Sequence, residues 1–111
     1  GVSYMYIVRR VAKTLPGKAW EVAGLLNKIV EAYEEAGRTK ARIYISGQST
    51  PGNPPTVYAE WTQERIEPTD MSKVPASVRE NNAKMQELLT EYSIEFYELA
   101  TQEKMKARGV A

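Results

Sequence analysis

The chain has 111 residues, enough for one compact domain with one core, and its 15 Lys and Arg balance 14 Asp and Glu to a net charge of +1. Binders of nucleic acids or membrane surfaces usually carry a clear basic excess, so this balance argues against both partners. The absence of Cys and His excludes disulfides, thiolate nucleophiles, Ser–His catalysis and imidazole ligation of a metal or haem.

The first third of the chain predicts a strand followed by a helix. Residues 4–12 (YMYIVRRVA) are rich in β-branched and aromatic side chains, which is typical of a strand. From Lys18 to Ala36 the apolar residues recur at spacings of three and four, the pattern of an amphipathic helix. Gly37 follows at once and suits the left-handed conformation that ends many helices.

The middle of the chain predicts a hairpin. Residues 40–47 (KARIYISG) alternate apolar and polar side chains with the period of a half-buried strand. Residues 56–64 (TVYAEWTQE) form a third expected strand, joined to the second through the loop 48–55. A second irregular connection, 67–76, contains two prolines.

The last third predicts a second helix and leaves its end open. Ser77 and Glu80 match the S-x-x-E capping box, so we expect the helix to begin near Ser77. Residues 93–100 (SIEFYELA) form either a fourth strand or a continuation of the helix, since no Gly or Pro marks a break. A continuous helix of about 28 residues would be roughly 42 Å long, more than the width of such a domain. We therefore favour the strand. The expected inward stripe of the second helix is Val78, Asn82, Met85, Leu89 and Tyr92.

This order of elements predicts an α+β fold of the ferredoxin-like, split βαβ type, with helices on one face of an antiparallel sheet. We expect a single domain over residues 1–111, with a core over about 4–100 and a charged tail, frayed or helical, over 102–111. The side under the helices should carry Met5, Ile7 and Val11; Ala41, Ile43 and Ile45; Val57, Ala59 and Trp61; and Ile94 and Phe96. The opposite side, called the open face below, should carry Tyr4, Tyr6, Val8 and Arg10; Arg42 and Tyr44; Tyr58, Glu60 and Thr62; and Glu95 and Tyr97.

The expected open face gathers five of the seven Tyr residues, too apolar for water and too polar for a dry core. It suits the interface of a homodimer, the lining of a ligand cavity or a stacking platform for bases. Arg42 and Glu60 form either an acid–base or anion-binding pair or a plain cross-strand salt bridge. Trp20 and Trp61 are expected in the core. The candidate ligand-binding residues are Tyr6, Arg10, Arg42, Tyr44, Tyr58 and Glu60.

The chain resembles the dimeric α/β-barrel superfamily. The supporting residues are Tyr6 to Val8 leading into 16–20 (PGKAW), the helix ending at Gly37, and the strand 56–61 (TVYAEW). The resemblance implies two ferredoxin-like protomers that press their open sheet faces together around a central cavity. The superfamily includes cofactor-free monooxygenases of the antibiotic-biosynthesis type, lactone isomerases and haem enzymes. Haem-binding members usually supply a His, which this chain lacks, so no haem is expected.

We therefore expect a homodimer whose Tyr- and Arg-lined face binds a small, partly aromatic organic molecule. Cofactor-free monooxygenase or isomerase activity is one hypothesis, and a ligand-binding or structural dimerisation domain without chemistry is the alternative. RNA-recognition domains share the strand order, but Glu60 would repel phosphate and the third strand lacks their Gly-rich basic signature. Asp70 is the only Asp and the Glu residues are scattered, so neither a metal site nor a cofactor is expected. The sequence shows neither a membrane-spanning run nor a secretory signal, which favours the cytoplasm over a membrane.

Overall fold

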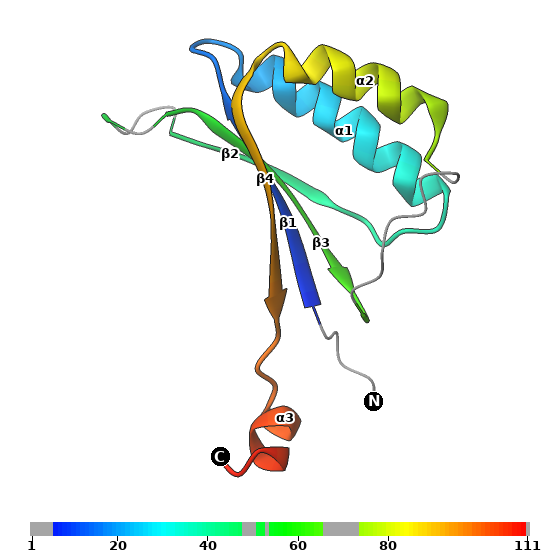
Figure 1. Ribbon diagram of the computed structural model, residues 1–111, viewed down its shortest axis with the longest axis vertical. Coiled ribbons are helices and arrows are strands. Elements are labelled where there is room, and N and C mark those ends of the chain that lie inside the picture. Colours follow the sequence, from blue (N-terminus) through cyan, green and yellow to red (C-terminus); the bar gives the residue numbers. More distant parts are fainter. Residues whose placement is uncertain (1–5, 48–50, 53, 66–73, 111) are drawn as a thin grey trace.

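A computed structural model describes residues 6–47, 51–52, 54–65 and 74–110. The chain has an α+β, ferredoxin-like arrangement of helices beside an antiparallel sheet (Figure 1). In chain order its elements are β1 (Tyr6–Thr14), α1 (Ala19–Glu35), β2 (Arg42–Ser46), β3 (Thr56–Gln63), α2 (Ala76–Gln86), β4 (Leu89–Glu98) and α3 (Gln102–Ala107). Tyr4, Met5 and Asp70 lie outside the described residues, as do parts of both predicted irregular connections.

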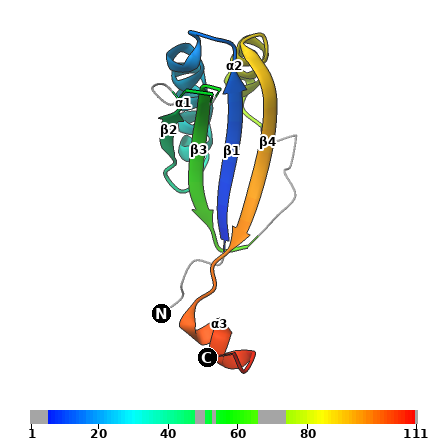
Figure 2. The same ribbon diagram turned by 90° about the vertical axis from the view of Figure 1, so that its left-hand side faces the viewer.

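The sheet has four strands in the order β2-β3-β1-β4, and every neighbouring pair is antiparallel (Figure 2). The predicted fourth strand is confirmed, but it begins at Leu89, four residues earlier than residue 93. Pairing with β1 explains the missing Gly or Pro, because the backbone groups of β4 find partners along the whole edge of β1. Just beyond the paired strands, the backbone N–H of Leu15 donates to the carbonyl of Leu88 at 2.9 Å.

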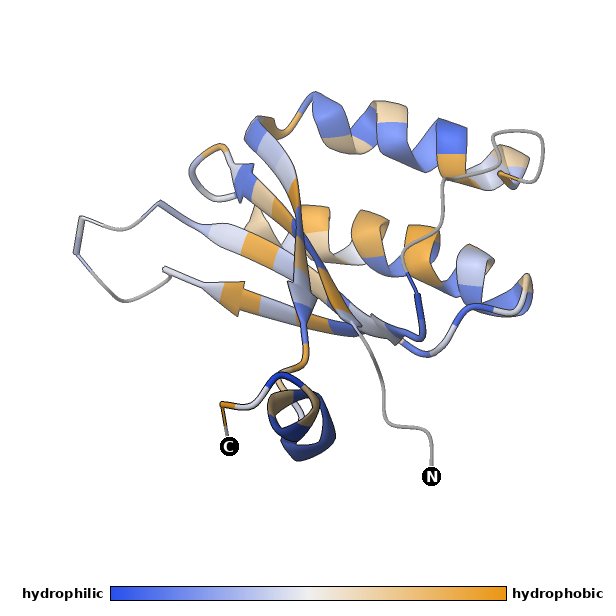
Figure 3. Ribbon diagram, turned by 60° about the horizontal axis from the view of Figure 1, so that its bottom comes forward, coloured by the Kyte–Doolittle hydropathy of each residue, from blue (hydrophilic) through white to orange (hydrophobic). Residues whose placement is uncertain are grey.

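Helix α1 matches the predicted helix closely and supplies the largest share of the core. Its apolar stripe faces the sheet, where the hydrophobic colours of Figure 3 concentrate. Gly37 has φ +107°, the left-handed conformation expected after the helix. The buried residues of the helix are Ala19, Val22, Ala23, Leu26, Ile29 and Val30. Trp20 is 72% exposed, so its predicted place in the core is wrong, whereas Trp61 is buried as expected.

Helix α2 packs against α1 rather than across the sheet (Figure 1). It begins one residue before Ser77, with Pro75 at the N-cap and no side-chain hydrogen bond at the cap, so the predicted capping box is not formed. Pro75 has no side-chain oxygen that could accept a capping hydrogen bond. Val78 and Met85 of the predicted inward stripe are buried, while Leu89 and Tyr92 belong to β4.

The side chains of β1 point the opposite way from the prediction. Val8 and Ala12 are buried among the core residues under α1, so Tyr6, Val8 and Arg10 share the helix side of the sheet. Ile7 and Arg9 then lie on the open face. Both sides of β1 carry branched apolar residues, and only the register with β3, in which Val8 stands opposite Trp61, decides which side is covered. The predicted sides of β2, β3 and β4 agree with this register.

Beyond β4 the chain ends in α3, which lies past the end of the sheet and away from α1 and α2 (Figure 1). The Oγ1 atom of Thr101 accepts a hydrogen bond from the backbone N–H of Lys104 at 3.2 Å and caps the helix. The predicted charged tail is therefore helical over part of its length.

Candidate functional site

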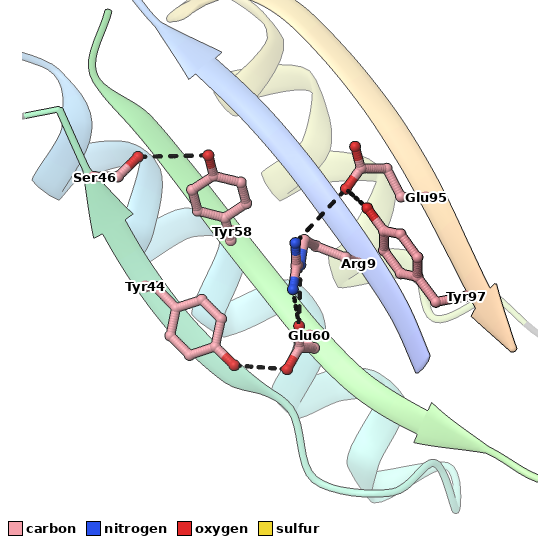
Figure 4. A network of polar contacts seen from close by, with 7 residues as sticks. All are labelled: Arg9, Tyr44, Ser46, Tyr58, Glu60, Glu95 and Tyr97. Atoms are coloured by element: carbon pink, nitrogen blue, oxygen red, sulfur yellow. Dashed lines mark hydrogen bonds and ion pairs between the residues drawn. The ribbon is translucent and has the colours of Figure 1, made fainter. Parts of the chain in front are cut away.

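A network of charged and phenolic side chains crosses the open face of the sheet (Figure 4). Arg9 donates from Nη2 and Nε to Oε1 of Glu60 at 2.7 and 3.0 Å. The hydroxyl of Tyr44 donates to the other oxygen of Glu60 at 2.8 Å. On the other side of Arg9, its Nη1 lies 3.9 Å from Glu95, which accepts a hydrogen bond from Tyr97 at 2.6 Å. We call Arg9, Tyr44, Glu60, Glu95 and Tyr97 the open-face network.

Each carboxylate of the open-face network has a hydrogen-bond donor and a positive charge beside it. Burial alone would raise the pKa of Glu60, but the hydrogen bonds from Arg9 and Tyr44 outweigh it and hold that pKa below its usual value. The hydrogen bond to Glu60 raises the pKa of Tyr44, and the one to Glu95 raises the pKa of Tyr97. At neutral pH Glu60 is therefore ionised, and the phenols of Tyr44 and Tyr97 are protonated. Because both oxygens of Glu60 are occupied, Glu60 is poorly placed to take a proton from a substrate.

Four of the predicted ligand-binding residues, Arg42, Tyr44, Tyr58 and Glu60, do lie together on the open face. Arg42 stands directly opposite Glu60 in the register, yet the ion pair of Glu60 is made by Arg9 on the other neighbouring strand. The rings of Tyr44 and Tyr58 are neighbours, with centroids 6.5 Å apart. The part played by Arg9 follows only once the orientation of β1 is known.

A second cluster lies on the helix side of the sheet. The guanidinium of Arg38 sits between two rings, with Cζ 3.9 Å from the centroid of Tyr33 and 4.3 Å from that of Trp61. Cζ of Arg10 lies 5.8 and 5.6 Å from the same two rings, and its Nη1 donates to the hydroxyl of Tyr92 at 2.7 Å. We call Arg10, Tyr33, Arg38, Trp61 and Tyr92 the arginine–aromatic cluster. It draws together the end of α1 and strands β1, β3 and β4.

The charges of the arginine–aromatic cluster are not compensated in the same way. Among the described residues, neither Arg10 nor Arg38 forms an ion pair with a carboxylate, and Nε of Arg10 and Nη1 of Arg38 are buried without a hydrogen-bond partner. Burial, together with repulsion from Arg10, lowers the pKa of Arg38 to about 10. Two cations thus share one weakly solvated site.

An apolar strip adjoins this cluster on the same side of the sheet. Ile94 and Phe96 stand opposite Arg10 and Val8 in the register, so they face the helix side. They are nevertheless 44% and 51% exposed, because α2 packs on α1 and leaves this part of β4 uncovered. Exposed large apolar side chains beside buried rings suit the docking of an organic molecule.

Tyr6 and Arg10, the other two predicted ligand-binding residues, are not on the open face. Both lie on the helix side, where the Nζ atom of Lys104 is 5.7 Å from the ring of Tyr6. Their predicted grouping with Tyr44 and Glu60 is therefore wrong, because the two sides of β1 are exchanged relative to the prediction. Sequence reasoning also missed Arg38 and Tyr33, which only the packing of the end of α1 against β3 brings to Trp61.

Neither the protein-family models nor the curated proteins include a match to this chain. Solved structures do resemble it. A candidate antibiotic biosynthesis monooxygenase from Chloroflexus aurantiacus J-10-fl has a TM-score of 0.61 at 15% identity, over 87% of this chain and 94% of its own. One of the same description from Deinococcus radiodurans has a TM-score of 0.59 at 18% identity, over 87% and 94%.

A third neighbour, from Bacteroides fragilis NCTC 9343, is described as a dimeric protein of unknown function and ferredoxin-like fold. Its TM-score is 0.56 at 12% identity, over 87% of this chain and all of its own. The chain therefore has a ferredoxin-like fold. Its structural neighbours include antibiotic biosynthesis monooxygenase-like proteins and a protein that is described as dimeric. Identities this low establish the fold alone.

The described residues contain neither a metal-binding group nor a membrane-spanning helix. No group of Asp or Glu side chains there is close enough to hold a metal ion. None of the helices in that part of the chain is long and apolar enough to cross a membrane.

Proposed function

We propose that this protein is a homodimer that binds a small, partly aromatic organic molecule on the helix side of its sheet. The observation that carries the proposal is the exposed strip of Ile94 and Phe96 beside the rings of the arginine–aromatic cluster. A flat ligand lying there would remove apolar surface from water and gain contacts with aromatic edges. The proposal places the protein in the cytoplasm, as its sequence predicts.

The open face supports the homodimer. Its charges alternate in sign across the strands, from Arg42 through Glu60 and Arg9 to Glu95, so the surface is complementary to a copy of itself. A two-fold interface needs this self-complementarity. On this proposal Arg42, Tyr44, Tyr58 and Glu60 contact the partner protomer, and a ligand between the two sheets stays a prediction of the sequence.

Binding is tested by tryptophan fluorescence in a Trp20→Phe background, which leaves Trp61 as the reporter. We expect quinols, polycyclic phenols or aromatic lactones to change this fluorescence saturably, and Phe96→Ala to weaken the binding about ten-fold. Leu15→Ala removes an exposed apolar side chain elsewhere and serves as the matched control. The proposal fails if no compound binds, or if Phe96→Ala and Leu15→Ala bind equally well.

The dimer is tested by light scattering on a sizing column across a dilution series. The protomer has a mass of 12.5 kDa, so a species of about 25 kDa is expected down to low micromolar concentration. A monomer over the whole series would contradict this part of the proposal and leave the binding result standing.

The proposal extends to cofactor-free oxygenation or isomerisation of the bound molecule. The description of several structural neighbours as antibiotic biosynthesis monooxygenases supports it, as does the hydroxyl of Tyr92, which is held by Arg10 and can exchange a proton. Oxygen uptake or a changed ultraviolet spectrum with a compound that binds is the expected result, lost in Tyr92→Phe. Binding without any turnover identifies a binding protein instead.

A further inference from the structure

Several basic side chains near the sheet have an acidic partner, and the two arginines of the arginine–aromatic cluster differ from them. Arg9 is paired with Glu60, Lys13 with Glu91 at 2.8 Å, and Lys104 with Glu98 at 3.2 Å. Within the described ranges, Arg10 and Arg38 have no such partner. Their positive charges repel each other and form a local electrostatic imbalance.

The imbalance is held in a fixed geometry. Cζ of Arg38 lies within 4.3 Å of the ring centroids of both Tyr33 and Trp61, and one end of the guanidinium of Arg10 donates a hydrogen bond to the hydroxyl of Tyr92. Stacked and anchored guanidinium groups keep little freedom to turn toward water. The buried Nε of Arg10 and Nη1 of Arg38 are therefore held without the hydrogen-bond partner that buried donors usually have.

A bound oxyanion would supply both the missing hydrogen-bond acceptor and the missing negative charge. It would accept hydrogen bonds from the unpartnered donors and would cancel the repulsion between the two cations. Guanidinium groups pair best with planar anions such as carboxylates, because two N–H groups of one fork can meet two oxygens. The rings of Tyr33 and Trp61 also favour a flat group over a bulky one.

We propose that Arg10 and Arg38 form a subsite for a planar oxyanion, so that the ligand is an aromatic carboxylate or enolate whose apolar part lies on Ile94 and Phe96. This inference rests on the proposed binding function and names the class of its ligand. The anionic group meets the arginines of β1 and the end of α1, and the ring system extends along the helix side of β4. The pairing of a cationic end with an apolar strip distinguishes such a ligand from neutral quinols.

The test compares 2-naphthoate with neutral 2-naphthylmethanol by isothermal titration calorimetry at constant ionic strength. We expect wild-type protein to prefer the carboxylate by about ten-fold or more, and Arg38→Met to reduce the ratio to near one. Arg38→Lys keeps the charge but loses the planar fork, so its preference should be intermediate. Arg79→Met, an exposed arginine on α2, is the matched control and should keep the full preference. Equal binding of the two compounds by wild type, or an unchanged preference in Arg38→Met, would overturn the inference.

Acetate, a planar carboxylate without an aromatic part, is titrated into the same variants and separates this inference from the proposed function. If both naphthyl compounds bind without preference, the binding function stands and the anion subsite is wrong. If acetate binds wild type but not Arg38→Met while neither naphthyl compound binds, the anion subsite stands and the proposed organic ligand is wrong. No binding by any of the three probes overturns both. Circular dichroism of each variant shows whether it is folded before binding is compared.

Discussion

The two faces of the sheet treat neighbouring arginines in opposite ways. Arg9, on the open face, is bound to Glu60 and lies near Glu95, whereas Arg10, on the helix side, meets rings, a phenol and another arginine. Successive side chains of a strand point to opposite sides, so a single step along the chain separates the two environments. The open face satisfies its own polar groups, and the helix side retains two unmatched cations. A self-satisfied surface suits packing against a copy of itself, and an unmatched one suits a ligand.

The largest expected effect tests which face β1 buries. Val8→Asp would place a carboxylate in the core at a side chain that is 1% exposed, costing about 4 kcal/mol, so the protein should not fold stably. Ile7→Asp on the open face should cost far less in the monomer. Urea denaturation followed by circular dichroism measures both variants. A larger loss for Ile7→Asp would reverse the assignment of the faces.

Reversing the central charge of the open-face network is the next largest effect. Arg9→Glu sets a carboxylate against Glu60 and Glu95, and we expect the free energy of unfolding to fall by about 2 kcal/mol and the dimer to dissociate. The double variant Arg9→Glu/Glu60→Arg restores the opposite charges and should recover part of both losses. Denaturation and light scattering report the two quantities. Full dimerisation of Arg9→Glu would show that the interface lies elsewhere.

Removing the charge of Arg38 on the helix side should raise the free energy of unfolding instead of lowering it. Arg38→Met keeps much of the apolar stem and removes a poorly solvated cation, so the ligand-free protein should become more stable by about 1 kcal/mol despite the lost ring contacts. Burial lowers the pKa of Arg38 to about 10 in the folded chain, and the unfolded chain keeps the higher, ordinary value of an arginine. Above about pH 10 the unfolded chain therefore binds more protons at Arg38 than the folded chain does. The free energy of unfolding of the wild type should then rise with pH relative to that of Arg38→Met. Thermal unfolding at pH 7 and above pH 10 checks both statements, and a destabilised Arg38→Met at pH 7 would contradict them.

The smallest expected effect concerns the ionisation of Glu60. Its pKa is held below the usual value of 4.5 in the folded protein, so ionised Glu60 stabilises the fold above that pH. Glu60→Gln should cost about 0.5 to 1 kcal/mol at pH 7, and the difference from wild type should shrink as pH falls through the lowered pKa. Denaturation at pH 7, 5 and 3 measures this profile. A difference that stays constant with pH would show that packing, and not the carboxylate charge, is responsible.

The sequence alone was sufficient for the class of fold and for most of the elements. The spacing of apolar residues over 18–36 defines α1, and the alternation in β2 and β3 identifies which of their side chains are buried. Each of these segments has one clearly apolar side, so the hydrophobic effect leaves it a single orientation. The open-face positions of Arg42, Tyr44, Tyr58 and Glu60 could be predicted for the same reason.

The tertiary structure alone decided the orientation of β1 and the composition of the arginine–aromatic cluster. Ile7 and Val8 are both apolar and Arg9 and Arg10 are both cationic, so the local pattern is nearly equal on the two sides of that strand. The register with β3 and β4 determines which side of β1 is covered, because it places Val8 between Trp61 and Phe96. Arg38 follows the end of α1 in a segment without periodicity, and only the packing of that helix on the sheet brings it between Tyr33 and Trp61. Contacts between residues far apart in the chain depend on packing, which a local pattern does not encode.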